Sequence, residues 1–138
     1  MKKNSVKIVV SALLIIAFAF VLVSCGNTAV IKAQTTVMLD AIIANDVDRA
    51  YDAMADELKL DKIKFKDDFS KLADYLDGVT EYELKQTSYY TGIQNSISYT
   101  KIVYSMSTNV GDFIVTTTVC DGYNGIYNIN ILAENEVS

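Results

Sequence analysis

Tyrosines and carboxylates are the side chains of this sequence that could do chemistry. The chain of 138 residues has nine tyrosines and seventeen aspartates and glutamates, but no histidine. Histidine is the most common general base and metal ligand in proteins. Its absence excludes Ser-His-Asp and Cys-His catalysis and leaves a zinc site without its usual ligand. We therefore expect neither a metal nor another cofactor, and no catalytic residue is assigned.

Most of the tyrosines fall in the second half of the chain. Those between residues 79 and 133 are Tyr82, Tyr89, Tyr90, Tyr99, Tyr104, Tyr123 and Tyr127. Such rings could line a cavity for a flat or apolar ligand, whose orientation the hydroxyls would fix. One prediction is therefore a ligand pocket formed by Tyr51, Tyr89, Tyr104 and Tyr127. The favoured alternative is that tyrosine suits the half-buried surface of a sheet, where it forms cross-strand pairs.

One thiol and a series of aspartates are the other candidates. Cys120 ends a predicted strand beside Asp121, with no nearby group in the sequence to lower its pKa, so we favour a buried, inert thiol over a nucleophile. If exposed, this thiol could form a mixed disulfide with another protein. Asp48, Asp52 and Asp56 are spaced to share one helical face, as an oxygen-rich calcium site could require. Because the spacing lacks a tight glycine loop, a solvated acidic face is favoured.

Three helices are expected to come first in the domain. The ranges with apolar residues at helical spacing are 29–44, 47–58 and 67–77. Asp46 is expected to cap the second helix, and Gly78 to end the third. A lysine-rich connector, residues 59–66, is predicted between them. Its lysines could neutralise nearby carboxylates or face lipid headgroups, or simply be solvated.

After Gly78 the apolar period becomes alternating, and β-branched and aromatic residues dominate. The predicted strands are 79–90, 97–107, 112–120 and 125–133, with turns at 91–96, 109–111 and 121–125, and a frayed end after residue 133. Sequential strands with short connections pair antiparallel. We therefore expect an α+β fold, in which three helices pack on one face of a four-stranded antiparallel sheet.

The first segment of the chain has the composition of a secretory leader. An apolar run over residues 8–23, whose only polar member is Ser11, follows Lys2, Lys3 and Lys7. At about 1.5 Å per residue this run would span about 24 Å, short of a hydrocarbon core of about 30 Å. The shortness favours a cleaved signal, with a retained anchor and plain secretion as the alternatives.

The end of that run, Leu22-Val23-Ser24-Cys25, resembles the lipobox of bacterial lipoproteins. The resemblance implies cleavage between Ser24 and Cys25 and a thioether-linked diacylglycerol on Cys25. The expected parts of the chain are a signal peptide over 1–24, a lipidated cysteine and short tether over 25–28, the domain over 29–134 and a tail over 135–138. The domain would lie outside the cytoplasm, on the cell membrane or, because Gly26 is not a retention aspartate, on an outer membrane.

The charge of the mature chain limits its partners. Beyond residue 24 there remain nine basic and seventeen acidic side chains, a net charge of −8. A surface of that sign repels nucleic acid and anionic headgroups, so we expect no nucleic-acid partner. The expected partners are the membrane, through the lipid on Cys25, and either another envelope protein or a small apolar ligand.

The stretch Ala44-Asn45-Asp46-Val47-Asp48-Arg49-Ala50-Tyr51 resembles the turn between the first two helices of nuclear-transport-factor-2-like (cystatin-like) domains in bacterial lipoproteins. Phe69-x-x-Leu72-x-x-x-Leu76-Asp77-Gly78 is similar to the short helix before their sheet. The resemblance covers most of the mature domain and implies a curved, cone-like roll. Enzymes of this group carry an Asp-His, Asp-Tyr or Asp-Arg set inside the cone, and this sequence lacks the histidine.

These observations lead to two hypotheses for function. The first is a membrane-anchored, non-enzymatic envelope lipoprotein that binds a partner protein or a small apolar ligand. The second is an envelope enzyme that uses a carboxylate/tyrosine pair inside the cone. An open pocket that holds a buried aspartate bonded to a tyrosine would favour the enzyme.

Overall fold

The computed structural model describes residues 27–59 and 61–136, so the predicted signal peptide, Ser24 and Cys25 lie outside the described residues. The elements in chain order are α2 (Asn27–Ile43), α3 (Val47–Ala53), the 3-10 turn η1 (Asp56–Leu58), α4 (Lys62–Tyr75), β1 (Tyr82–Gln94), β2 (Ile97–Thr108), β3 (Asp112–Cys120), β4 (Asn128–Ala133) and the 3-10 turn η2 (Glu134–Glu136). None of the helices in these ranges has the length and apolar character needed to cross a bilayer.

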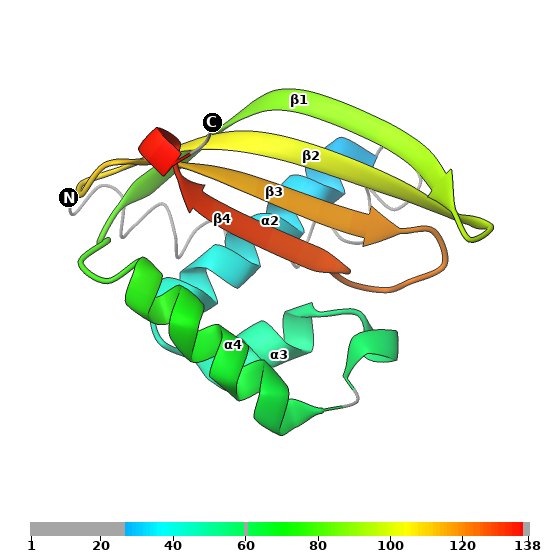
Figure 1. Ribbon diagram of the computed structural model, residues 1–138, viewed down its shortest axis with the longest axis horizontal. Coiled ribbons are helices and arrows are strands. Elements are labelled where there is room, and N and C mark those ends of the chain that lie inside the picture. The colour runs from blue at the N-terminus through cyan, green and yellow to red at the C-terminus, as the bar shows by residue number, and fades with distance from the viewer. Residues whose placement is uncertain (1–26, 60, 137–138) are drawn as a thin grey trace.

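The elements form two layers. The sheet has the order β1-β2-β3-β4, and every neighbouring pair is antiparallel. Figure 1 shows the helices on one side of the curved sheet, with α2 passing beneath the strands. The predicted fold class, three helices packed on a curved four-stranded antiparallel sheet, is therefore confirmed.

The core lies between α2 and the inner face of the sheet. From α2 it receives Ile31, Met38, Leu39 and Ile42, and from β2 and β3 it receives Ile102, Tyr104, Met106 and Val115, all exposed by 2% or less. The alternation predicted for β2 is present, because its inner residues are buried while Lys101 and Ser107 face solvent. Burial of this apolar surface is the main stabilising contribution to the fold.

A bulge in β1 changes which of its residues face the helices. Gln86 pairs with Tyr104 and Ser88 pairs with Val103, so Thr87 is an extra residue in β1. Before the bulge, even-numbered residues of β1 share the inner face, and after it odd-numbered residues do. A bulge also bends its strand and increases the local twist, which agrees with the curvature of the sheet in Figure 1.

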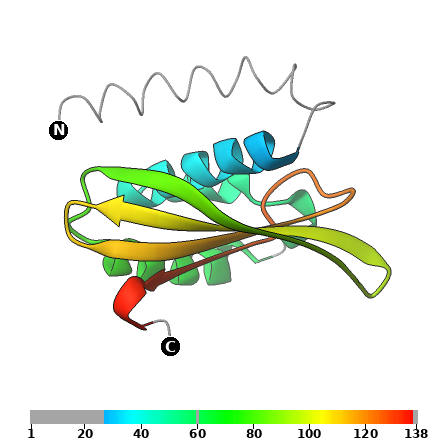
Figure 2. The same cartoon turned by 90° about the horizontal axis from the view of Figure 1, so that it is seen from above.

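The loop predicted at residues 91–96 is wrong, because β1 continues to Gln94 and pairs there with Ile97. The connection is the two-residue turn Asn95-Ser96, with φ angles of 52° and 66°. Left-handed φ at both central residues is typical of the type I′ hairpin turn, which matches the twist of the strands. The last β2–β3 pair is Tyr99 with Cys120, so the hairpin end beyond it is a two-stranded ribbon that projects from the sheet (Figure 2).

The second helix ends at Ala53, five residues before its predicted end at Leu58. Met54 instead forms a parallel bridge with Ile126, in which the Ala55 N–H donates to Ile126 O at 3.0 Å and the Ile126 N–H donates to Ala53 O at 3.1 Å. Tertiary pairing thus overrides the helical pattern of the sequence. Because Ile126 takes part in this bridge, β4 begins at Asn128 and not at the predicted residue 125.

The lysine-rich connector is also shorter than predicted, because α4 already begins at Lys62. Asp61 caps this helix by accepting a hydrogen bond from the Lys64 N–H at 2.9 Å. The Lys64 and Asp68 side chains pair one turn apart at 2.9 Å. After β4 the chain forms η2, where the sequence predicted a frayed end.

Candidate functional site

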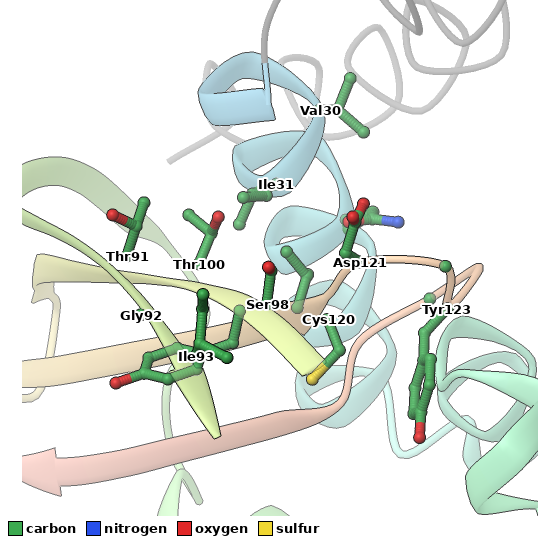
Figure 3. Close-up of a pocket in the computed structure, with 15 residues that line it drawn as sticks. Val30, Ile31, Thr91, Gly92, Ile93, Ser98, Thr100, Cys120, Asp121 and Tyr123 are labelled. Atoms are coloured by element: carbon green, nitrogen blue, oxygen red, sulfur yellow. The ribbon is translucent and has the colours of Figure 1, made fainter. Parts of the chain in front are cut away.

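A large hollow in the described structure lies between the start of α2 and the hairpin end of the sheet. Its volume is about 690 Å³. The first two turns of α2 form one wall, the paired ends of β1 and β2 form the opposite wall, and the end of β3 with the following loop closes one side (Figure 3).

The lining combines aliphatic groups with hydroxyls and an amide. Aliphatic members come from both layers, namely Val30, Ile31, Ile93 and Val119, and the hydrogen-bonding members include Gln34, Thr91, Ser98 and Thr100. Figure 3 shows Ile31 pointing from α2 toward Ser98 and Thr100. A lining of this kind can bury the apolar body of a small molecule and orient it through a few hydrogen bonds.

The bulge in β1 explains why the hollow has this lining. Past Thr87, the residues of β1 that face the helices are Thr91 and Ile93, which pair with Thr100 and Ser98 of β2. Without the extra residue, the opposite set of β1 side chains would face α2. The alternation of apolar residues gives no signal for a bulge. For this reason Thr91, Ile93 and their partners on β2 could not be predicted from the sequence as lining residues.

None of the four tyrosines predicted to form a pocket lines this hollow. Tyr127 lines a smaller hollow of about 280 Å³, which also includes Tyr99 and Lys101 and therefore lies on the face of the sheet turned away from the helices. Tyr89 is about half exposed on β1 and lines neither hollow. The predicted pocket of these tyrosines is therefore wrong.

Tyr51 packs between α3 and α4, away from the hollow. Its ring meets the Phe65 ring edge-on, with centroids 5.2 Å apart. Its hydroxyl donates a hydrogen bond to the Lys59 carbonyl at 2.9 Å. These contacts engage both the ring and the hydroxyl within the fold, which corrects the prediction that Tyr51 helps to form a ligand pocket.

Tyr104 belongs to the core. It is fully buried, and its hydroxyl has no hydrogen-bond partner among the described residues. Burial raises the pKa of Tyr104 to about 12, and the nearby Thr35 hydroxyl offsets part of that rise. Thr35 itself bonds to Ile31 O at 2.7 Å and to the Thr117 hydroxyl at 2.8 Å. These residues form a small polar cluster inside the α2–sheet interface.

Cys120 is a free thiol that is neither fully buried nor activated. It is the last residue of β3 and lines both hollows. Burial raises the pKa of the Cys120 thiol above its ordinary value of 9.0, so the reactive thiolate is disfavoured at neutral pH.

A buried aspartate bonded to a tyrosine does occur, at a position that the sequence analysis did not single out. Tyr82 at the start of β1 donates a hydrogen bond to Asp40 of α2 at 2.6 Å. Burial raises the pKa of Asp40, and this rise is offset in part by the Tyr82 hydroxyl and by the charge of Arg49. The signal was the single carboxylate in the apolar run Met38-Leu39-Asp40-Ala41-Ile42. Neither residue lines the hollows described above.

The aspartates proposed as a calcium site do not share one helical face. Asp56 lies beyond the end of α3, in η1, where it accepts hydrogen bonds from Lys59 and from the Asn124 amide at 2.9 Å and 2.7 Å. These two partners, Lys59 first, hold the pKa of Asp56 below its ordinary range. Within residues 27–59 and 61–136, no three carboxylates or thiols are arranged to hold a metal ion.

The lysines of the predicted connector pair with carboxylates. The Lys62 amine lies 3.2 Å from an Asp48 oxygen, and the Lys59 amine lies 2.9 Å from Asp56. Both Asp48 and Asp56 are well exposed, so each pair contributes little to stability. Of the alternatives for these lysines, the geometry favours neutralisation of nearby carboxylates.

Comparison with protein-family models, with curated proteins and with solved structures finds no match to this chain. Function must therefore be inferred from the residues and their arrangement. Among the described residues, the arrangement offers a hollow at the α2–hairpin end and a buried carboxylate/tyrosine pair elsewhere. Another hollow, of about 480 Å³, lies between the β2–β3 turn and the end of β4.

Proposed function

We propose that this chain is a non-enzymatic envelope lipoprotein, tethered by a diacylglycerol on Cys25, whose hollow binds a small ligand with an apolar body and a few polar groups. The lipobox resemblance supports the tether. The nuclear-transport-factor-2-like assignment is part of the same proposal, and it is supported by the motifs around Tyr51 and Leu76 and by the order of helices followed by a curved sheet.

The observation that carries the binding role is the size and chemistry of the hollow. Its volume of about 690 Å³ falls within the usual range for ligand sites, about 300–1,000 Å³. Its titratable members include Cys120 and Asp121, but no carboxylate there is bonded to a tyrosine or another general base. Such a lining can hold and orient a ligand, but it lacks an acid–base pair to transform one.

The position of the hollow agrees with a ligand that is encountered at a membrane. Val30 and Ile31 line it from the first two turns of α2. Val30 follows Cys25 by five positions, and five steps of about 3.6 Å span at most about 18 Å. A diacylglycerol on Cys25 would therefore hold the hollow close to the lipid surface.

The alternative is an enzyme that uses Asp40 and Tyr82, and the 2.6 Å hydrogen bond between them is the observation in its favour. The raised pKa of Asp40 would suit a general acid or base. Against it, Asp40 is only 6% exposed, and a substrate would need an opening at the pair. We therefore favour a structural role, in which the pair joins α2 to β1.

The ligand hypothesis can be tested by filling the hollow. The full chain, expressed in a bacterium that lipidates its lipoproteins, would be purified in mild detergent as wild type, Ser98→Trp and Ser107→Trp. Ser98 lines the hollow, whereas Ser107 is an exposed residue of the same strand outside it. Mass spectrometry of the small molecules released on denaturation should find a species in the wild type and in Ser107→Trp that Ser98→Trp lacks. Identical small molecules in all three would contradict the binding role.

The anchor is tested separately by the mass of the N-terminal peptide. A diacylglycerol on Cys25 is expected, and Cys25→Ala should leave the leader uncleaved. A bare Cys25 thiol would refute the anchor without bearing on the hollow.

A further inference from the structure

We propose that the hairpin end of the sheet rests on the lipid bilayer, as a second contact beside the diacylglycerol. The surface concerned, here called the hairpin patch, consists of Tyr90, Ile93 and Ile97. The inference relies on the lipid anchor of the proposed function, and it specifies how the domain is oriented on the membrane.

The hairpin patch exposes large apolar side chains where the fold gives them no partner. The exposed fractions are 74% for Ile93, 54% for Tyr90 and 36% for Ile97. Beyond the Tyr99–Cys120 pair the ribbon has no third strand, so Ile93 and Ile97 project from a two-stranded tip (Figure 2). Ile93 lies on the face of the ribbon turned toward α2, whereas Tyr90 and Ile97 lie on the opposite face. Both faces of the projecting tip therefore expose apolar side chains, which is typical of a binding surface.

The hairpin patch lies in a part of the chain with few acidic residues. No aspartate or glutamate occurs between Glu83 and Asp112, a stretch that includes Lys85 and Lys101. The first three turns of α2, residues 27–39, also lack acids and contain Lys32. Asp121 is the one carboxylate among the residues that line the hollow beside the tip. Most of the negative charge of the mature chain lies elsewhere, so anionic headgroups repel the hairpin end less than the remaining surface.

The composition of this end fits a bilayer interface. Tyrosine is enriched where membranes meet water, because its ring is apolar and its hydroxyl is polar. The Lys101 amine lies 5.9 Å from the centre of the Tyr99 ring, so a lysine and an aromatic ring occur together beside the tip. Lysine can bury its stem against apolar surface while its amine stays at the headgroups.

The hairpin patch also lies at the end of the molecule where the tether would emerge. Ile93 and Val30 line the same hollow, and Figures 1 and 2 both show the start of α2 and the Asn95-Ser96 turn toward the same end. Cys25 is two residues before α2. A domain held there by lipid can thus bring its hairpin to the bilayer, with the hollow between tether and tip.

The test measures how deeply the tip enters the bilayer. In full chains carrying Cys120→Ser, a single new cysteine is introduced by Ile93→Cys or by Ile63→Cys, and a bimane dye is attached. Ile63 is the matched control, because it is also an isoleucine, is 83% exposed and lies on α4. The lipidated proteins are reconstituted into vesicles of phosphatidylcholine and phosphatidylglycerol that contain nitroxide-labelled lipid.

We expect the nitroxide lipid to quench the dye at position 93 at least about twice as strongly as the dye at position 63, since interfacial groups lie about 5–10 Å into the headgroup region. Equal, weak quenching at both positions, with the diacylglycerol on Cys25 verified by mass, would overturn the bilayer contact and leave the anchor intact. Loss of quenching together with an unmodified Cys25 would refute the anchor itself. The dye at position 93 could also be shielded from water without any lipid, to a degree that grows with protein density. That result would show that a second copy covers the hairpin patch, and it would also overturn the proposal.

Discussion

Replacement of Gly125 by alanine should break the contact between the two halves of the fold. Gly125 precedes the bridge between Met54 and Ile126. A Cβ atom on Gly125 would lie 2.7 Å from the Met54 carbonyl carbon, and 2.8 Å from both Ala53 O and Ala55 N. All three are backbone atoms, so no side chain can rotate away to make room.

The expected cost follows from these distances. Carbon atoms in contact normally lie about 3.5–4.0 Å apart, so the loop must move by about 0.8 Å or more. Overpacking of this kind costs about 1–3 kcal/mol. The movement also threatens the two hydrogen bonds of the bridge, each of which contributes about 0.5–1.5 kcal/mol. We therefore expect Gly125→Ala to lower the free energy of unfolding by about 2–4 kcal/mol.

Urea unfolding followed by far-ultraviolet circular dichroism measures this loss, with Gly122→Ala as the control. Gly122 lies in the same loop with φ of +83° and open space around its Cβ position, so alanine there costs only backbone strain of about 1 kcal/mol. Hydrogen exchange at the Ala55 and Ile126 amides should accelerate only in Gly125→Ala. If Gly125→Ala is no less stable than Gly122→Ala, or if those amides stay protected, the close approach does not hold the loop as described.

Three further predictions concern buried polar groups. Burial holds the pKa of Asp40 in the folded state above its ordinary value of 3.8. Asp40 therefore favours folding while it is protonated, and its contribution to the free energy of unfolding is lost as the pH rises from 3.8 through the folded-state pKa. Asp40→Asn should therefore unfold at higher urea than wild type at pH 7 and at similar urea near pH 3. Asp40→Ala should lose about 1–3 kcal/mol of unfolding free energy, because it leaves the Tyr82 hydroxyl only the longer hydrogen bond to the Thr36 carbonyl at 3.4 Å. Tyr104→Phe removes a buried hydroxyl without a partner and should be neutral or stabilising in the same assay, and a loss above about 1 kcal/mol would reveal an unseen partner. Cys120 should react with N-ethylmaleimide more slowly than free cysteine, with a rate that still rises above pH 9, and a fast reaction at pH 7 would contradict its raised pKa.

The fold class could be predicted because the spacing of apolar residues is regular in the helices and strands that pack against the core. Buried and exposed residues alternate along β2 as its sequence does, and the sharp change of period after Gly78 marks the passage from helices to sheet. Boundaries set by distant contacts could not be predicted. The end of α3 depends on the pairing of Met54 with Ile126, which no local pattern reveals.

The candidate site was predicted poorly because it, too, depends on contacts between residues that are distant in the sequence. The sequence offered a tyrosine pocket as one alternative and favoured a packing role for the tyrosines, and Tyr51 and Tyr104 are used for packing. The residues that line the hollow are mostly small and aliphatic, such as Thr91 and Ile93, and the extra residue at Thr87 decides which way they face. The lone carboxylate of α2 was visible in the sequence, but its partner Tyr82 is brought to it only by the tertiary fold.

The bulge has a consequence for association as well. β1 is a long strand at the border of the sheet, and such a border offers unpaired amides and carbonyls to any neighbouring chain. Pairing of this strand with the same strand of another copy would be a route to fibril-like association. The additional residue at Thr87 interrupts the regular spacing of those groups midway along β1. The strand of a second copy could therefore pair with β1 only before or only after Thr87. This limits the number of backbone hydrogen bonds that two copies could form with each other.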